Sequence, residues 1–247
     1  MNAIEENDFT RGWQAMAGII PKPAAILVLS AHWFVRGIRL LNDLRPKMTY
    51  DLYGFPQALY QVVYEAPGSP AFADMTSDLL SQAGIGSVVD NSWGYDHGTW
   101  SVLNHMYPER DVPVFQMSID RTAPPETHFA IGKILSGLRE AGVLILGSGN
   151  IVHNLNLIDW YKPEGGFDWA DAFDLLVHEQ ILKKNFDQLV HYPTIGRSAD
   201  LSIPTPDHYW PLLYILGACQ ENDTATVFND SRIMGSLSMT SYLFSAP

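Results

Sequence analysis

Three of the eight histidines follow short apolar runs of the kind that form buried strands. His32 follows residues 25–29, His97 follows residues 87–89 after a short loop, and His153 follows residues 143–146. Because ligands gather beyond the carboxyl ends of parallel strands, we expect these side chains to lie together at one edge of a sheet. Imidazoles in such a place can bind a divalent metal or transfer protons near neutral pH.

A fourth histidine, His208, is expected at the start of a helix. Thr205 is a good N-cap residue, and Pro206 suits the first helical position, so His208 falls in the first predicted turn. The positive end of the helix dipole disfavours imidazolium there. A neutral His208 would therefore be available as a metal ligand.

Taken alone, a histidine after a strand is more often a hydrogen-bonded loop residue than part of a site. Four of them at strand ends or a helix start, each beside glycine, serine, asparagine or an aromatic residue, favour a common site. The other four are expected to be structural, half-buried or solvated and are left out of it: His105, His128, His178 and His191.

Four familiar functional motifs are absent. His178-Glu179 has no second histidine at the spacing of a zinc protease, and residues 147–149 do not complete a Gly-x-Ser-x-Gly elbow. The glycines at 147 and 149 are too few for a dinucleotide loop or a P-loop. We expect them to let the backbone turn tightly beneath the site.

The composition restricts the class of protein and its partners. A formal charge of −12 over 247 residues argues against nucleic acid or an anionic membrane as a partner. The single cysteine, Cys219, excludes an internal disulfide and is expected as a packed core thiol. No apolar stretch approaches the ~20 residues of a membrane span, and the acidic N-terminus does not look like a signal peptide. A cytoplasmic enzyme is the resulting expectation.

Strand-like and helix-like segments alternate along the chain. Strands are expected at 25–29, 87–89, 112–117 and 143–146, with helices at 9–20, 71–83, 125–142 and 170–184. This alternation predicts one α/β domain over residues 1–247, with a largely parallel sheet between helical layers. Residues 225–228 and 237–243 are expected as additional strands near an edge. The long stretch 43–67 is either a lid or binding loop, or a plain surface connection.

Six motifs, in order along nearly the whole chain, resemble the class III extradiol ring-cleavage dioxygenases, and their 4,5-DOPA dioxygenase-like (LigB-type) branch in particular. They are Ser-Ala-His-Trp at 30–33, Gly-Phe-Pro-Gln-Ala-Leu-Tyr at 54–60, Ala-Pro-Gly-Ser-Pro at 66–70, Trp-Gly-Tyr-Asp-His-Gly at 93–98, Gly-Ser-Gly-Asn at 147–150 with His-Asn at 153–154, and Thr-Pro-Asp-His-Tyr at 205–209. The resemblance implies a three-layer αβα sandwich with a mixed, mostly parallel sheet. The family's first strand and its Gly-His-Gly-Ser-Pro segment are expected to be missing from this sequence.

The resemblance also implies a divalent metal, Fe(II) or Zn(II), held by His32, His153 and His208. His97 would bind substrate and act as acid and base, and His153 would be either a ligand or a second proton-transfer group. Trp33 and Tyr95 would contact a small catechol, DOPA-like or related, that is opened with O₂. The chain would be a monomer or a small homo-oligomer.

Physical chemistry is consistent with such a site. Imidazoles suit both iron and zinc, and hydrogen bonds with Asp96, Asn150 and Asn154 are expected to fix their tautomers. Trp33, Trp93, Tyr95 and Trp100 are expected either to line an aromatic pocket or, for two of them, to pack in the core. Two other functions remain open: a zinc-dependent hydrolase, and a catalytically impaired homologue that binds metal or catechol without turnover.

Overall fold

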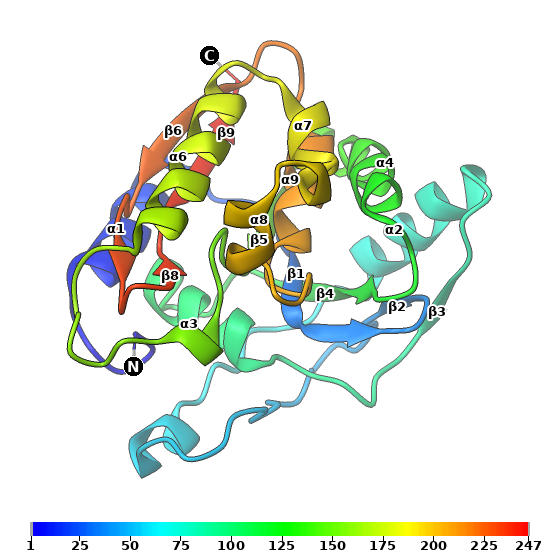
Figure 1. The fold of residues 1–247 in the computed structure, drawn as a ribbon. Coiled ribbons are helices and arrows are strands. Elements are labelled where there is room, and N and C mark those ends of the chain that lie inside the picture. Colours follow the sequence, from blue (N-terminus) through cyan, green and yellow to red (C-terminus); the bar gives the residue numbers. More distant parts are fainter. Residues whose placement is uncertain (1, 247) are drawn as a thin grey trace.

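The computed structural model describes residues 2–246, which fold around a five-stranded sheet (Figure 1). The strand order is β3-β2-β4-β1-β5. Strand β1 pairs in parallel with β4 and β5, β2 pairs in parallel with β3, and β2 meets β4 antiparallel. The bounds are β1 Ala25–Val35, β2 Ile38–Leu40, β3 Ser87–Val89, β4 Val114–Asp120 and β5 Val143–Ser148. The predicted α/β class with a mixed, mostly parallel sheet is confirmed.

Helices cover both faces of this sheet, as the alternation along β1 requires. Leu27 and Leu29 face one core and Ile26 and Val28 face the other, because successive side chains of a strand point to opposite faces. The first core includes residues of α2, α4, α5, α6 and α9, and the second includes residues of α3. These bounds are α2 Pro70–Gln82, α3 His97–Met106, α4 Pro125–Leu135, α5 Gly137–Glu140, α6 Asp168–Leu182 and α9 Trp210–Ala218.

The remaining helices are short or peripheral. Helix α1 spans Asp8–Ile19 and begins at a capping box between Asn7 and Thr10. The others are α7 Phe186–Val190 and α8 Arg197–Ser202, with 3₁₀ turns at Gln57–Gln61, Leu155–Leu157 and Tyr192–Thr194. The helix expected over 125–142 is interrupted at Ser136, so that it forms α4 and α5, and Gly142 then takes a positive φ of 79°.

The C-terminal strands differ from the expectation. They form two separate antiparallel ribbons, β6 Thr224–Phe228 with β9 Ser241–Ser245, and β7 Arg232–Ile233 with β8 Leu237–Ser238. None of these pairs with the central sheet in the part of the chain that the structure describes. Four of the five residues of β9 are polar or aromatic. Such a composition suits an edge strand and a separate ribbon equally, so the sequence does not distinguish the two.

The two edges of the central sheet are exposed to different extents. At the β3 edge, Val88 and Val89 are exposed, although this segment was expected to be covered on both faces. A groove of about 260 Å³ lies along β5 and includes His208 among its lining residues.

Within residues 2–246, no helix is both long and apolar enough to cross a membrane.

Candidate active site

His32 lies inside β1 rather than after it, which corrects the expected position. The strand runs to Val35, but its register against β4 shifts between Leu29 and Phe34. Such an irregularity re-aims side chains next to functional sites. Gly98 packs against this point, since a Cβ there would lie 2.9 Å from Cδ2 of His32. The apolar run ended at Ser30 in sequence, which made the strand look shorter than it is.

The four histidines expected to converge do so. The ring centroids of His32 and His97 are 3.7 Å apart, and those of His32 and His208 are 5.3 Å apart. His153 stacks on His208 with centroids 3.5 Å apart and planes inclined by only 3°. These residues come from β1, the start of α3, the loop after β5 and the turn before α9. Separate segments of the chain thus form one cluster of imidazoles.

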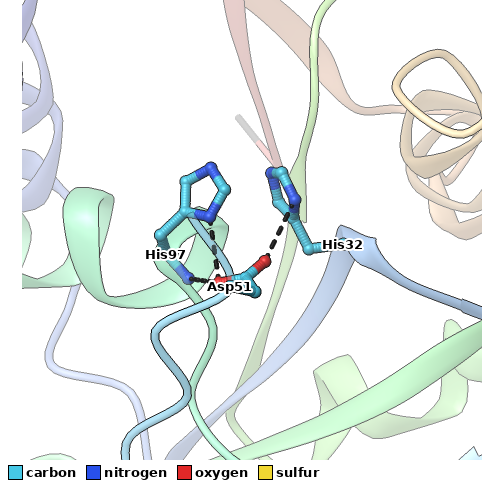
Figure 2. A group of neighbouring side chains, drawn as sticks. All are labelled: His32, Asp51 and His97. Atoms are coloured by element: carbon cyan, nitrogen blue, oxygen red, sulfur yellow. Dashed lines mark hydrogen bonds and ion pairs between the residues drawn. The ribbon is translucent and has the colours of Figure 1, made fainter. Parts of the chain in front are cut away.

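A carboxylate that the sequence analysis did not single out, Asp51, bridges two of these rings (Figure 2). Its Oδ2 lies 3.2 Å from Nδ1 of His32, and its Oδ1 lies 2.9 Å from Nδ1 of His97. The backbone N–H of His97 also donates to Oδ1 at 2.9 Å. The only signal in the sequence was the position of Asp51 in the irregular stretch 43–67, one of whose two interpretations was a binding loop.

The loop that carries Asp51 is fixed along the segment that carries His97. Tyr95 N–H donates to the carbonyl of Lys47 at 2.9 Å, and Thr49 N–H donates to the carbonyl of Tyr95 at 2.7 Å. The two backbones approach closely at Gly94, where a Cβ would lie 2.1 Å from the Lys47 carbonyl oxygen. Asp51 is therefore held by ordered backbone and is not on a free surface loop.

Charge interactions distinguish His32 from His153 and His208. Burial alone would lower the pKa of His32, but the hydrogen bond to Asp51 and the charges of Asp96, Asp51 and Asp207 outweigh it and raise that pKa. Burial would raise the pKa of Asp51, but its hydrogen bonds to His32 and His97 hold that pKa well below the usual range. Asp51 is accordingly an ionised acceptor near neutral pH.

His208 precedes its helix rather than belonging to the first turn. Helix α9 begins at Trp210, while Tyr209 and Trp210 N–H both donate to the carbonyl of Pro206 and close a turn around His208. Burial lowers the pKa of His208, against the hydrogen bond from its Nδ1 to Asp207 at 2.5 Å. The expected neutral imidazole is thus supported, but its cause is burial and not a helix dipole.

His153 is also kept neutral by burial. Its backbone N–H donates to the Ser202 carbonyl at 2.9 Å, and it forms an isolated bridge with Leu237. Burial lowers the pKa of His153 to about 3, and the neighbouring His208 adds to the effect. An imidazole with so low a pKa keeps a free lone pair at neutral pH, as metal binding requires.

Gly147 at the end of β5 and Gly149 just after it act through close contact rather than through a tight turn. A Cβ on Gly149 would lie 2.2 Å from the carbonyl oxygen of His208, and the neighbouring Asn150 N–H donates to that oxygen at 2.9 Å. Neither Gly147 nor Gly149 has a positive φ. They allow the turn that carries His208 to lie directly against the end of β5.

The three residues expected to orient the imidazoles make hydrogen bonds to other groups instead. Asp96 caps α3 through Thr99 N–H and accepts hydrogen bonds from Ser30, Trp93 and Gln116. The side chains of Asn150 and Asn154 donate to the carbonyls of Ser238 and Leu201. Asp51 and Asp207 take the orienting role instead, since each lies against an imidazole Nδ1.

The aromatic residues expected near a substrate are mostly part of the core. Trp33, Tyr95 and Trp100 are at most 1% exposed, and the Tyr95 hydroxyl donates to the Val114 carbonyl at 2.8 Å. Trp33 and Tyr95 therefore present no surface to a substrate, which corrects that expectation. Trp93 is half-buried and stacks on Trp33, with ring centroids 6.2 Å apart.

The residues left out of the site lie elsewhere. His105 donates from Nε2 to the Asn2 carbonyl at 2.6 Å, whereas His178 and His191 are half-buried in or after helices. His128 is fully buried against Tyr214, with its pKa lowered by burial to about 4, so it is less exposed than expected. Cys219 caps α9 and is only half-buried, so it is not the fully packed thiol that was expected.

The donor chemistry of the cluster fits a divalent transition metal. Two of its imidazoles are neutral by burial, and carboxylates contact Nδ1 of three rings, the arrangement in which Nε2 serves as the ligand atom. Among residues 2–246, one group of three donors has all its atoms within 4.8 Å of one another: His32, Asp51 and His97. This group overlaps the expected ligand set only at His32.

Comparisons with known proteins identify the family of this chain. Residues 6–245 match the family described as the catalytic LigB subunit of aromatic ring-opening dioxygenase. The chain is 40% identical over 245 residues to a 4,5-DOPA dioxygenase extradiol of Escherichia coli K12, covering 98% of this chain and 89% of the relative. It is 38% identical over 230 residues to the protein of the same description from Beta vulgaris, covering 91% and 84%.

A solved structure supports the same relationship. The crystal structure of an uncharacterized Escherichia coli K12 protein superposes with a TM-score of 0.83 at 39% identity, covering 97% of this chain and 93% of that one. The chain belongs to the LigB family of aromatic ring-opening dioxygenases, as the resemblance of its motifs predicted. It is an aromatic ring-cleaving dioxygenase of the extradiol type.

Proposed function

We propose that this enzyme is Fe(II)-dependent and opens the ring of a small catechol, DOPA-like or closely related, with O₂. The convergence of His32, His97, His153 and His208 carries the proposal, since four imidazoles from distant segments suit a metal centre better than a structural core. The descriptions of the bacterial and plant relatives support the choice of a DOPA-like substrate.

Iron would be held by His32 and His208, with His153 as a third ligand or as a hydrogen-bond acceptor. When bound, it supplies Lewis acidity toward the two catechol oxygens and the redox chemistry that activation of O₂ needs, which zinc lacks. Asp207 contacts Nδ1 of His208, so Nε2 of that ring is the atom free to coordinate.

His97 is the proposed acid and base. Its Nδ1 is engaged by Asp51, which leaves Nε2 to accept a phenolic proton and return it as the ring opens. Its side chain is about 30% exposed, so a substrate can reach it. His153, with a pKa of about 3, stays neutral and acts as a ligand or hydrogen-bond acceptor rather than as a proton store.

The loop that carries Asp51 is the proposed determinant of substrate choice. It presents apolar side chains to solvent immediately beyond Asp51, with Tyr53 89% and Phe55 49% exposed. Exposed aromatic side chains beside a polar site are suited to contact an aromatic ring. Substrate selectivity would then depend on this loop and not on Trp33 and Tyr95, which are buried.

Oxygen uptake by the enzyme loaded anaerobically with Fe(II) tests the proposal. With DOPA or protocatechuate, uptake and a ring-opened product are expected for the unaltered enzyme, with both lost in His97→Ala and His32→Ala. His191→Ala is the matched control, because His191 lies outside the cluster and is half exposed. Zinc-loaded enzyme is expected to consume no oxygen. Equal uptake by the His97→Ala variant would contradict the role of His97.

A further inference from the structure

Asp51 lies in contact with two imidazoles that have different proposed roles. Its Oδ2 faces Nδ1 of His32 at 3.2 Å, while its Oδ1 receives both Nδ1 and the backbone N–H of His97, each at 2.9 Å. Its side chain is only 14% exposed, and the loop around it is hydrogen-bonded along the segment before α3. The carboxylate is thus fixed in place before any ligand binds.

An ionised carboxylate accepts hydrogen bonds and donates none. Each neutral imidazole in contact with it must therefore carry its proton on Nδ1, so that Nε2 of the same ring keeps a lone pair. Figure 2 shows both rings turned with Nδ1 toward Asp51 and the other nitrogen away from it. One side chain imposes the same tautomer on two residues from different parts of the chain.

We propose that Asp51 is a positioning residue that fixes the tautomers of His32 and His97 together, and so exposes the Nε2 lone pair of both. The usefulness of those two lone pairs, one for the metal and one for the substrate proton, rests on the proposed function. The tautomers themselves do not, because they follow from the contacts of Asp51 alone.

The two oxygens of Asp51 are not equivalent, and this gives the inference a specific consequence. In Asp51→Asn, the amide carbonyl is expected to take the Oδ1 position, because the backbone N–H of His97 must have an acceptor there. The amide NH₂ then takes the Oδ2 position, facing Nδ1 of His32. Nδ1 of His32 must then accept a hydrogen bond from the amide, so His32 carries its proton on Nε2. His97 keeps its proton on Nδ1.

Nitrogen NMR of the imidazoles in the metal-free protein tests this directly. The spectra are taken at about pH 9, above the usual range of histidine titration, so that the rings are neutral. In the unaltered protein, His32 and His97 are expected to carry the proton on Nδ1. In Asp51→Asn, only His32 is expected to change to the Nε2–H form. Asp43→Asn is the control, because Asp43 is in the same loop but only bonds the backbone of Arg45.

Other results would overturn the inference. An Nε2–H tautomer at either ring in the unaltered protein would contradict it, as would an unchanged His32 in folded Asp51→Asn. Should that variant fold poorly, Asp51→Ala is measured instead, and both rings are expected to lose the Nδ1–H preference. Oxygen uptake plays no part in this measurement. Correct tautomers without catechol turnover would therefore refute the proposed function and leave the role of Asp51 standing.

Discussion

The histidine cluster has two halves that are held in different ways. In one half, His32 and His97 share the carboxylate of Asp51, and charge raises the pKa of His32 despite its burial. In the other half, His153 and His208 stack on each other, and burial lowers the pKa of both rings. Contacts with Asp51 hold the two rings of the first half, whereas burial away from water lowers the pKa values of the two rings of the second half.

Under the proposed function, this difference would allow one site to serve both proton transfer and metal binding. His97 has its Nδ1 held by Asp51 and is about 30% exposed, so its Nε2 can take up and return a proton. A buried ring beside another imidazole resists protonation, which suits a metal ligand near neutral pH. His32 belongs to the first half and also contacts His208, so the two halves meet at this residue.

The largest effect is expected from His32→Ala, which removes the contact between the halves. Affinity for Fe(II), measured by anaerobic titration, is expected to fall by more than about 100-fold, since even the partners of metal ligands contribute about 10–100-fold. His191→Ala is the control and is expected to bind Fe(II) as the unaltered protein does. Unchanged affinity in His32→Ala would remove His32 from the ligand set.

A comparison of Asp51→Asn with Asp207→Asn shows which half of the cluster contributes more to activity. Each substitution is expected to lower kcat/KM for a catechol by about 10–100-fold, with the larger loss in Asp51→Asn. Asp51 contacts two imidazole rings, whereas Asp207 contacts one, that of His208. Steady-state oxygen uptake provides the measurement. A larger loss in Asp207→Asn would show that the stacked half dominates.

Gly98→Ala tests how tightly the cluster is packed. A Cβ there would lie 2.6 Å from Oγ of Ser30 and 2.9 Å from Cδ2 of His32, so overpacking is expected to cost about 1–3 kcal/mol of unfolding free energy. Gly18→Ala is the matched control, because nothing lies within 4 Å of that helical position, and a gain of up to about 1 kcal/mol is expected. Urea unfolding measures both. Equal effects would contradict the close contact at His32.

The smallest expected effect concerns stability. In the metal-free protein, the contributions of His153 and His32 to the unfolding free energy change with pH in opposite directions. The folded-state pKa of His153 is lowered from 6.5 to about 3, so its contribution to stability is present above pH 6.5 and is lost as the pH falls toward 3. The pKa of His32 is raised, so its contribution is present below pH 6.5 and is lost as the pH rises through the raised value.

Urea unfolding of the metal-free variants at about pH 5 and about pH 8 checks these signs. Relative to the unaltered protein, His153→Gln is expected to be less destabilised at the lower pH, and His32→Gln more destabilised there. Changes of the same sign in both variants would mean that the two halves share one electrostatic environment.

Much of the architecture could be predicted from local patterns. The apolar run at 25–29, the helical periodicity at 9–20 and the convergence of histidines after strands all appear in the structure. What was mispredicted depends on contacts between distant residues. The continuation of β1 through His32 needs the bulge against β4, and the separate C-terminal ribbons have pairing partners that periodicity does not reveal.

The orienting carboxylates were missed for the same reason. Asp51 becomes important only because the loop 43–67 lies along the segment before α3, and no local pattern in that loop distinguishes it from other acidic residues. Conversely, Tyr95 was predicted to contact the substrate, yet its side chain is buried in the core. Adjacency along the chain did not determine which side of the backbone faces the cluster.

The central claim is that these imidazoles hold one Fe(II) ion through nitrogens turned away from their carboxylates. An anomalous difference map at the iron edge, from crystals grown anaerobically with Fe(II), tests it most directly. We predict one peak within about 2.1 Å of Nε2 of His32 and of Nε2 of His208 or His153. A peak among Asp51 and the Nδ1 atoms of His32 and His97, or no peak at the cluster, would contradict the account.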